Sequence, residues 1–131
     1  MILLDTHAWV WWLSAPESLP EPCRLAIDEA TRHRRLLVSS ISVWEVALLV
    51  SKGRLQLTIP VEDWVAKAEA LPFLKFVPVD NAIALRSVNL PGSLHPDPAD
   101  RIIVATALQR NARLITRDDR IRTYPHVRTV W

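Results

Sequence analysis

The sequence contains little glycine and almost no cysteine, and each shortage excludes a class of site. Only two glycines, Gly53 and Gly92, occur in 131 residues. A phosphate-binding loop or a dinucleotide-binding turn needs several glycines close together, so neither is expected. The single cysteine, Cys23, cannot form an intrachain disulfide and cannot supply a cysteine-rich zinc site. A lone thiol suits the reducing environment of the cytosol.

Long apolar runs are also missing. The apolar residues at the N-terminus stop at Asp5, and no basic segment precedes them, which argues against a signal peptide. The run from Ala8 to Leu13 is far shorter than the ~20 apolar residues that span a bilayer. We therefore expect a cytoplasmic protein with no membrane segment. Half of the residues are hydrophobic, which predicts a single domain over residues 1–131 with a real core.

The charge is small in sum but uneven along the chain. The net charge is +2, yet residues 101–131 contain seven arginines and only two acids, Asp118 and Asp119. Such a basic segment favours a polyanionic partner, for example a nucleic acid. A solvated basic face is the simpler explanation, and charge alone does not decide between the two.

Short apolar runs alternate with helical patterns, which is typical of an α/β fold with a parallel sheet. The predicted strands cover residues 1–4, 36–39, 75–79, 113–116 and 127–130. The predicted helices cover residues 8–13, 23–31, 42–51, 61–71, 80–87 and 99–111. We therefore expect a central parallel sheet of four to five strands with helices on both faces. Pro78 indicates that the third strand lies at an edge or ends early.

Four acids stand where a carboxylate is uncomfortable. Asp5 and Asp118 each follow a predicted strand, in MILLD and RLITRD. Glu45 is the only charge in the segment SISVWEVALLV. Asp100 shares the apolar face of the helix predicted over residues 99–111. Because open parallel sheets form their sites at the carboxyl ends of the strands, all four acids can gather at one edge.

Each acid also has an ordinary structural explanation. Glu45 stands three residues after Ser42, which is the spacing of a capping box. Asp100 suits the first turn of a helix, where the helix dipole favours negative charge. Asp118 suits a turn that begins a short helix. Asp97 stands three residues before Asp100 and competes with it for the same site.

The four acids together predict a metal site, because gathered carboxylates repel one another unless a cation joins them. Oxygen ligands favour hard divalent ions, so the expected cofactor is Mg²⁺ or Mn²⁺. Such an ion activates water for the hydrolysis of a phosphodiester. Four basic residues are candidates for holding a nucleic-acid backbone beside the acids: Lys52, Arg54, Arg101 and Arg117.

Four segments together resemble the PIN domain, and specifically the VapC toxins of type II toxin–antitoxin systems. They are LLDTH, SVWEVA, DPADRIIVATAL and LITRD, and they follow one another along nearly the whole chain. The resemblance implies a PIN-like three-layer fold and a divalent-metal-dependent endoribonuclease. The acidic quartet that it implies is Asp5, Glu45, Asp100 and Asp118. Thr6 and Thr116 match hydroxyl positions that support this quartet.

The same resemblance implies the partners. RNA is the expected substrate, a VapB-like antitoxin is expected to cover the acidic site, and a homodimer is expected. Operator DNA is expected to bind only through the antitoxin. Five tryptophans, the three in AWVWWL together with Trp44 and Trp64, are candidates for the dimer or the antitoxin contact, and core packing is expected for at least half of them.

Three alternatives stay open at this point. Asp97 competes with Asp100, which we favour because it directly precedes the apolar helix. Asp119 competes with Asp118, which we favour because it is closer to the strand. The alternative function is a catalytically silent PIN-like binding module that acts only through its complex with antitoxin and DNA.

Overall fold

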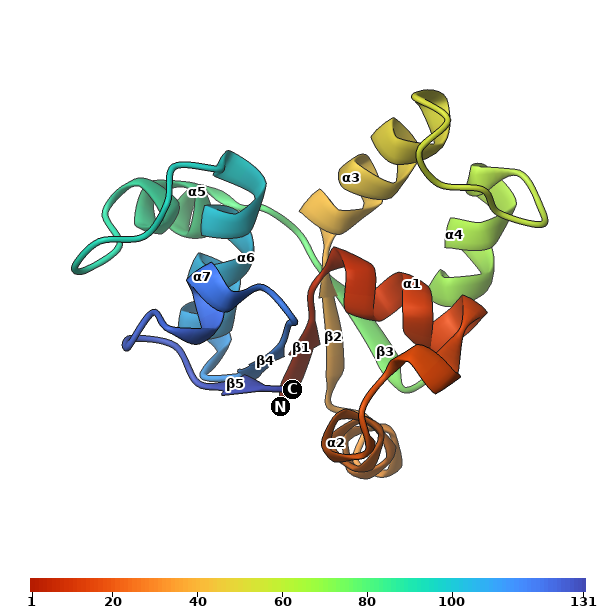
Figure 1. Ribbon diagram of the computed structural model, residues 1–131, viewed down its shortest axis with the longest axis horizontal. Helices are drawn as coiled ribbons and strands as arrows, with labels where there is room; N and C mark the ends of the chain where they lie inside the picture. The colour runs from red at the N-terminus through yellow and green to blue at the C-terminus, as the bar shows by residue number, and fades with distance from the viewer.

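A five-stranded parallel sheet forms the middle of the protein, whose computed structural model describes residues 1–131 (Figure 1). The strand order is β3-β2-β1-β4-β5, so β1 is central and β3 is an edge strand, as the proline predicts. The strands are β1 (Ile2–Leu4), β2 (Leu36–Ser39), β3 (Leu74–Val77), β4 (Arg113–Ile115) and β5 (Thr129–Val130). All neighbouring strands run parallel, which confirms the predicted sheet.

Helices cover both faces of this sheet. They are α1 (Thr6–Ser14), α2 (Glu21–Arg32), α3 (Ser40–Ser51), α4 (Val61–Glu69), α5 (Asn81–Val88), α6 (Pro98–Arg110) and α7 (Asp119–Arg122). Figure 1 shows α5, α6 and α7 on one side of the sheet and α1, α2 and α4 on the other. The predicted three-layer α/β architecture is therefore confirmed.

The central strand β1 feeds two separate cores. Ile2 and Leu4 belong to one cluster of buried side chains, which includes residues of α1 and α2. Leu3 belongs to the other, which includes residues of α6 and α7. Because successive strand residues point to opposite faces, three consecutive apolar residues supply both layers. This explains why MILL reads as a continuous apolar run rather than an alternating one.

The register brings three polar residues to one edge of the sheet. Leu4 lies beside Val38 of β2 and beside Ile115 of β4. The next residue along each of these strands is therefore Asp5, Ser39 or Thr116, at the carboxyl edge. The backbone amide of Asp5 donates to the carbonyl of Ile115 over 3.1 Å, which holds β1 and β4 in step up to this point.

The main differences from the predicted elements lie at helix starts. α1 begins at Thr6 rather than at residue 8, and α3 begins at Ser40 rather than at residue 42. In both cases the helix starts directly after the strand, because Asp5 is the N-cap of α1 and Ser39, the last residue of β2, is the N-cap of α3. The helix α7, a single turn, was not predicted as an element of its own. Every helix falls short of the length and hydrophobicity that a membrane-spanning segment requires.

Most of the tryptophans belong to the core. Trp9 and Trp64 are buried with their ring centroids 4.5 Å apart. Trp11, Trp12 and Trp131 are half-buried, and only Trp44 is exposed. Of the five tryptophans considered in the sequence, Trp9, Trp11, Trp12 and Trp64 pack in or against the core, so the expectation that at least half serve packing is confirmed, and Trp44 is the exposed one.

Candidate active site at the carboxyl edge of the sheet

Helix starts at the carboxyl edge of the sheet carry three of the four predicted acids. The carboxylate of Asp5 caps α1 by accepting a 2.8 Å hydrogen bond from an amide of its first turn. Asp118 caps α7 in the same way, through the amide of Arg120. Asp100 lies in the first turn of α6, whose N-cap is Asp97. The positive ends of these helix dipoles lower the cost of gathering negative charge here.

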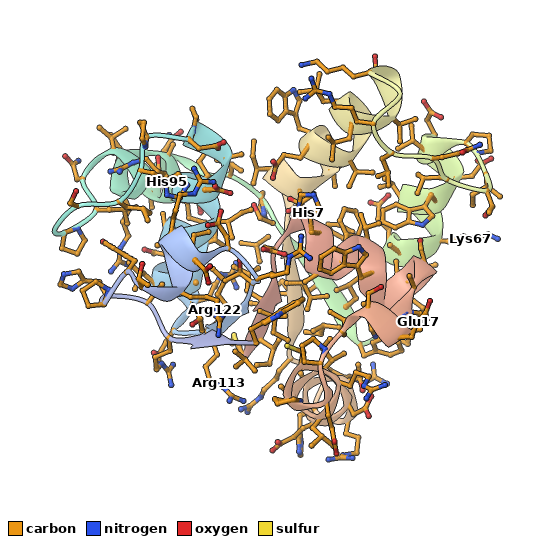
Figure 2. All side chains as sticks on the ribbon, in the orientation of Figure 1. His7, Glu17, Lys67, His95, Arg113 and Arg122 are labelled. Carbon is orange, nitrogen blue, oxygen red and sulfur yellow. The ribbon has the colours of Figure 1, made fainter.

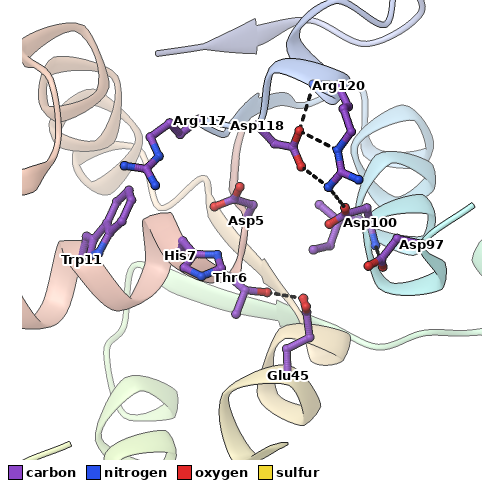
Figure 3. Close-up of a pocket in the computed structure, with 11 residues that line it drawn as sticks. Asp5, Thr6, His7, Trp11, Glu45, Asp97, Asp100, Arg117, Asp118 and Arg120 are labelled. Carbon is purple, nitrogen blue, oxygen red and sulfur yellow. Dashed lines mark hydrogen bonds and ion pairs between the residues drawn. The ribbon is translucent and has the colours of Figure 1, made fainter. Parts of the chain in front are cut away.

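All four predicted acids line one pocket of about 370 Å³ (Figure 3). The other residues that line it are Thr6, His7, Trp11, Asp97, Ile103, Arg117 and Arg120. Asp119 does not line it; its side chain is exposed and pairs with Arg122 at 3.4 Å. Of the two open choices, the structure therefore separates Asp118 from Asp119, whereas Asp97 and Asp100 both reach the pocket.

Three of these acids form an inner group whose charge is poorly compensated. Burial raises the pKa of Asp5, of Glu45 and of Asp100, and it is the largest cause in each case. The negative charge of Asp100 raises the pKa of both others further. No basic side chain forms an ion pair with Asp5 or Glu45; their hydrogen bonds come from neutral groups. Asp5 and Glu45 therefore lack a cation that would balance them, whereas Asp100 has Arg120 at 3.8 Å.

Glu45 is held by Thr6 and not by a capping box. Its Oε1 accepts a 2.5 Å hydrogen bond from the hydroxyl of Thr6, and Thr6 Oγ1 lies 2.9 Å from Ser42 Oγ. Because a carboxylate only accepts, the single proton of Thr6 goes to Glu45, and Ser42 donates to Thr6. The capping-box explanation is wrong because the helix begins at Ser40 and is capped by Ser39.

Thr116 links two of the acids through its buried hydroxyl. Its Oγ1 accepts a 3.1 Å hydrogen bond from the backbone amide of Asp118. The same hydroxyl lowers the pKa of Asp5 against the larger effect of burial. Thr6 and Thr116 thus stand beside acids of the quartet that the family resemblance implies.

Asp118 forms an outer part of the site and already has a counter-ion. Its two carboxylate oxygens accept hydrogen bonds from Arg120, at 3.2 Å from Nε and 2.9 Å from Nη2 (Figure 3). These bonds hold the pKa of Asp118 below its ordinary value, opposite to the inner acids. Arg120 Nη2 also lies 3.8 Å from Oδ2 of Asp100. The sequence did not single out Arg120, because an arginine in a basic segment is an ordinary surface residue.

His95 also was not predicted to belong to the site. Its Nε2 lies 2.7 Å from Oδ2 of Asp100, whereas its Nδ1 is buried without a hydrogen-bond partner. A buried N–H without an acceptor is costly, so we assign the proton to Nε2, which donates to Asp100. His95 lies in the loop before α6, where no helical or strand periodicity indicates which way a side chain points. The sequence therefore contained no indication of its contact with Asp100.

One ligand atom each from His95, Asp100 and Asp118 lies within 4.8 Å of the other two. An imidazole that binds a metal usually donates its other N–H to a partner. His95 offers no such pair, because its Nδ1 has no acceptor. His95 therefore orients Asp100 and does not have the paired hydrogen bonds typical of a metal ligand.

The four basic candidates separate clearly in the structure. Arg117 lines the pocket, with its guanidinium carbon 4.9 Å from the ring centroid of Trp11. Arg101 was wrongly assigned to the site: it donates to the carbonyls of Ser87 and Leu94, both at 2.9 Å, and so anchors the loop before α6.

Lys52 and Arg54 follow α3, at the end of that helix away from the sheet (Figure 1). Neither lines the pocket, because the twelve residues of α3 separate them from the carboxyl edge. Only one of the four predicted cations therefore stands beside the acids.

Comparison with known proteins agrees with this geometry. The PIN domain family matches residues 2–127. The chain is 39% identical over 132 residues to Ribonuclease VapC22 of Mycobacterium tuberculosis (strain ATCC 25618 / H37Rv), covering 99% of this chain and 98% of that protein.

Solved structures share the fold at lower sequence identity. VapBC2 from Rickettsia felis, bound to a DNA fragment from its promoter, has a TM-score of 0.72 at 17% identity, covering 99% of this chain and 98% of that one. FitAcB from Neisseria gonorrhoeae has a TM-score of 0.71 at 24% identity, covering 100% and 97%. The family match and the curated relative together show that this chain belongs to the PIN-domain family, among its VapC-type members.

Proposed function

We propose that this protein is the toxin of a type II toxin–antitoxin system and acts as a divalent-metal-dependent endoribonuclease. The observation that carries the proposal is a single pocket lined by five carboxylates, of which Asp5 and Glu45 are half-buried without a basic partner. The similarity to Ribonuclease VapC22 over nearly the whole chain supports the same activity. RNA is then the substrate, and the cytoplasm is the place of action.

The residues present fit a hard divalent ion. The inner donors are all carboxylate oxygens, which suit Mg²⁺ or Mn²⁺ and not a thiolate-binding metal. Three of these acids have a raised pKa, so a cation among them would relieve a cost that the fold otherwise bears. We propose that Asp5, Glu45 and Asp100 hold the ion and that Asp118 completes the set.

When bound, the ion supplies a Lewis acid that lowers the pKa of water and offsets the charge of the attacked phosphate. Thr6 fixes the carboxylate of Glu45 and offsets part of the rise in its pKa, and His95 does the same for Asp100. Thr116 fixes the backbone beside Asp118. We propose that Arg117 at the rim contacts RNA, because its guanidinium has no carboxylate partner.

The deciding experiment compares wild type with Asp100→Asn and Asp119→Asn on structured RNA, in Mg²⁺, in Mn²⁺ and in EDTA. Cleavage is expected only for wild type and Asp119→Asn with a metal present, since Asp119 lies outside the pocket. Cleavage by Asp100→Asn, or cleavage in EDTA, would contradict the mechanism. If every protein is inactive on all RNAs while still binding an antitoxin, the alternative of a catalytically silent binding module is favoured.

We also propose a VapB-like antitoxin and a homodimer as partners, with operator DNA bound only through the antitoxin. Similar solved structures include a DNA-bound VapBC from Salmonella typhimurium, with a TM-score of 0.69. Large apolar side chains are exposed on α3 and α5, namely Trp44, Leu85 and Val88, and we propose them for the dimer contact. A molar mass of one chain in light scattering would contradict the dimer.

A further inference from the structure

The rim of the pocket next to α1 combines an aromatic ring with a free cation. The guanidinium of Arg117 lies over the ring of Trp11, 4.9 Å from its centroid, and both residues line the pocket. Trp11 is half-buried and is itself held by Trp131, whose ring centroid lies 5.8 Å away. Figure 3 shows Arg117 and Trp11 together on one side of Asp5, with Arg120 on the other.

The two arginines of the pocket differ in whether their charge is already used. Arg120 is bound by both oxygens of Asp118 and lies near Asp100. Arg117 forms no ion pair with any acid of the chain and is exposed. A phosphate that approaches the pocket therefore meets one uncommitted cation, which stands on the Trp11 side.

Electrostatics favours this side for the nucleic-acid backbone. The centre of the pocket carries carboxylates that repel phosphates, so a backbone needs fixed positive charge at the rim. An arginine side chain normally loses much rotamer freedom when it binds a phosphate. Contact with an aromatic face restrains the guanidinium beforehand, and cation–π contacts of this kind recur in single-strand binding.

We propose that Arg117 and Trp11 form a subsite for single-stranded RNA, in which Arg117 binds a backbone phosphate flanking the cleaved one and Trp11 positions Arg117. The inference rests on the proposed ribonuclease function and deepens it, because it assigns the substrate strand to one side of the pocket. Single-stranded RNA is the class favoured here, since unstacked nucleotides can place one phosphate on Arg117 and the next at the acids.

The first test is the binding of a fluorescein-labelled random-sequence RNA of twelve nucleotides, followed by anisotropy in EDTA at several salt concentrations. The variants are Arg117→Gln and the matched control Arg113→Gln. Arg113 is the first residue of β4 and Arg117 follows the end of that strand, so Arg113 stands at the opposite end, away from His7 and the pocket (Figure 2). EDTA prevents metal-dependent cleavage, and a guanidinium–phosphate contact needs no metal.

Arg117→Gln is expected to weaken binding about tenfold, as loss of one charge-assisted hydrogen bond does. It should also lower the slope of log affinity against log salt by about 0.7, which corresponds to one phosphate on a single strand. Arg113→Gln should leave the slope within error of wild type. Equal effects of the two variants, or no measurable binding by wild type, would overturn the subsite.

The second test asks whether Trp11 acts through Arg117. Trp11→Leu removes the aromatic face and should weaken RNA binding about two- to fivefold, whereas Trp11→Phe should restore most of the loss. In the double variant with Arg117→Gln, Trp11→Leu should have no further effect. Additive losses would show that Trp11 has only a structural role and would overturn its positioning role.

These results stay distinct from the test of the proposed function. Metal-dependent cleavage that survives while Arg117→Gln and Arg113→Gln bind RNA equally would overturn the subsite and leave the ribonuclease proposal standing. Absence of cleavage together with absence of RNA binding would overturn both.

Discussion

The inner and the outer parts of the acid site balance negative charge in different ways. Asp5 and Glu45 are half-buried and receive hydrogen bonds only from neutral donors, and burial raises their pKa values. Asp118 is bound through both oxygens by Arg120, which lowers its pKa. Within one pocket, Asp5 and Glu45 therefore have no cation and can bind one, whereas Asp118 is already paired with an arginine.

This difference has a consequence for metal binding. A divalent ion held by Asp5 and Glu45 displaces no side-chain cation, and Arg120 is 3.8 Å from Asp100, whereas an ion that uses Asp118 must first displace Arg120 from its 2.9 Å contact. An exposed ion pair in water is weak, so Arg120 can be displaced at modest cost. The inner acids are therefore expected to determine whether the ion binds, and Asp118 to adjust its affinity.

The largest effects are expected from Asp5→Asn set against Asp118→Asn. Asparagine retains the oxygen that caps the helix in both positions, so folding should survive. Loss of a residue that only supports a metal ligand costs up to ~100-fold in activity, so Asp5→Asn, which changes a proposed ligand, should reduce metal-dependent cleavage by more than that. Asp118→Asn should reduce it by about tenfold. Initial rates of RNA cleavage and Mn²⁺ titration by calorimetry would measure both.

Correct folding of both variants is checked by circular dichroism, and each spectrum should match that of wild type. Equal losses for the two variants would contradict the division of the site into an inner and an outer part. A larger loss for Asp118→Asn would place the main ligand on the outer side instead.

A smaller effect of opposite sign is expected for Arg120→Gln. Removing the counter-ion of Asp118 frees both of its oxygens, so Mn²⁺ should bind roughly two- to fivefold more tightly. Arg122→Gln is the matched control, because it removes the same charge from the same helix but pairs with Asp119 outside the pocket. Unchanged or weaker Mn²⁺ binding by Arg120→Gln, relative to this control, would contradict the inference that Arg120 and the metal ion compete for Asp118.

The smallest effect is a pH dependence of stability. The pKa values of Asp5 and Glu45 are raised on folding, so the folded state binds more protons than the unfolded state above their ordinary values of 3.8 and 4.5. The free energy of unfolding in EDTA should therefore fall as pH rises through the raised pKa values. A drop of about 4 °C in Tm corresponds to about 1 kcal/mol in a domain of this size.

Scanning calorimetry between pH 4 and pH 8 would measure this, and Mg²⁺ should raise Tm most at the upper end, where the inner acids are ionised. Asp118 contributes with the opposite sign, because its lowered pKa adds stability that is lost only as pH falls through that value. A Tm in EDTA that rises steadily with pH over the whole range would contradict the raised pKa values of the inner acids.

Much of the candidate site could be predicted because its acids are attached to regular elements. Asp5 ends a short apolar strand and Asp100 begins an apolar helix, and such patterns are local in the sequence. The capping-box explanation of Glu45 failed because Ser39 capped the helix one turn earlier than expected. Arg101 was misassigned because its partners are backbone carbonyls, whose positions depend on a loop.

The order of apolar runs and helices by itself determined that the chain forms a parallel α/β sheet, and that acids end its strands and begin its helices. Those features follow from burial and helix geometry, which act over a few neighbouring residues. Only the tertiary structure decided that Thr6 holds Glu45, that Arg120 lies beside Asp100 and that Trp11 holds Arg117. The physical reason is that hydrogen bonds, ion pairs and aromatic contacts depend on distances of a few ångströms between side chains, which the packing of whole elements sets.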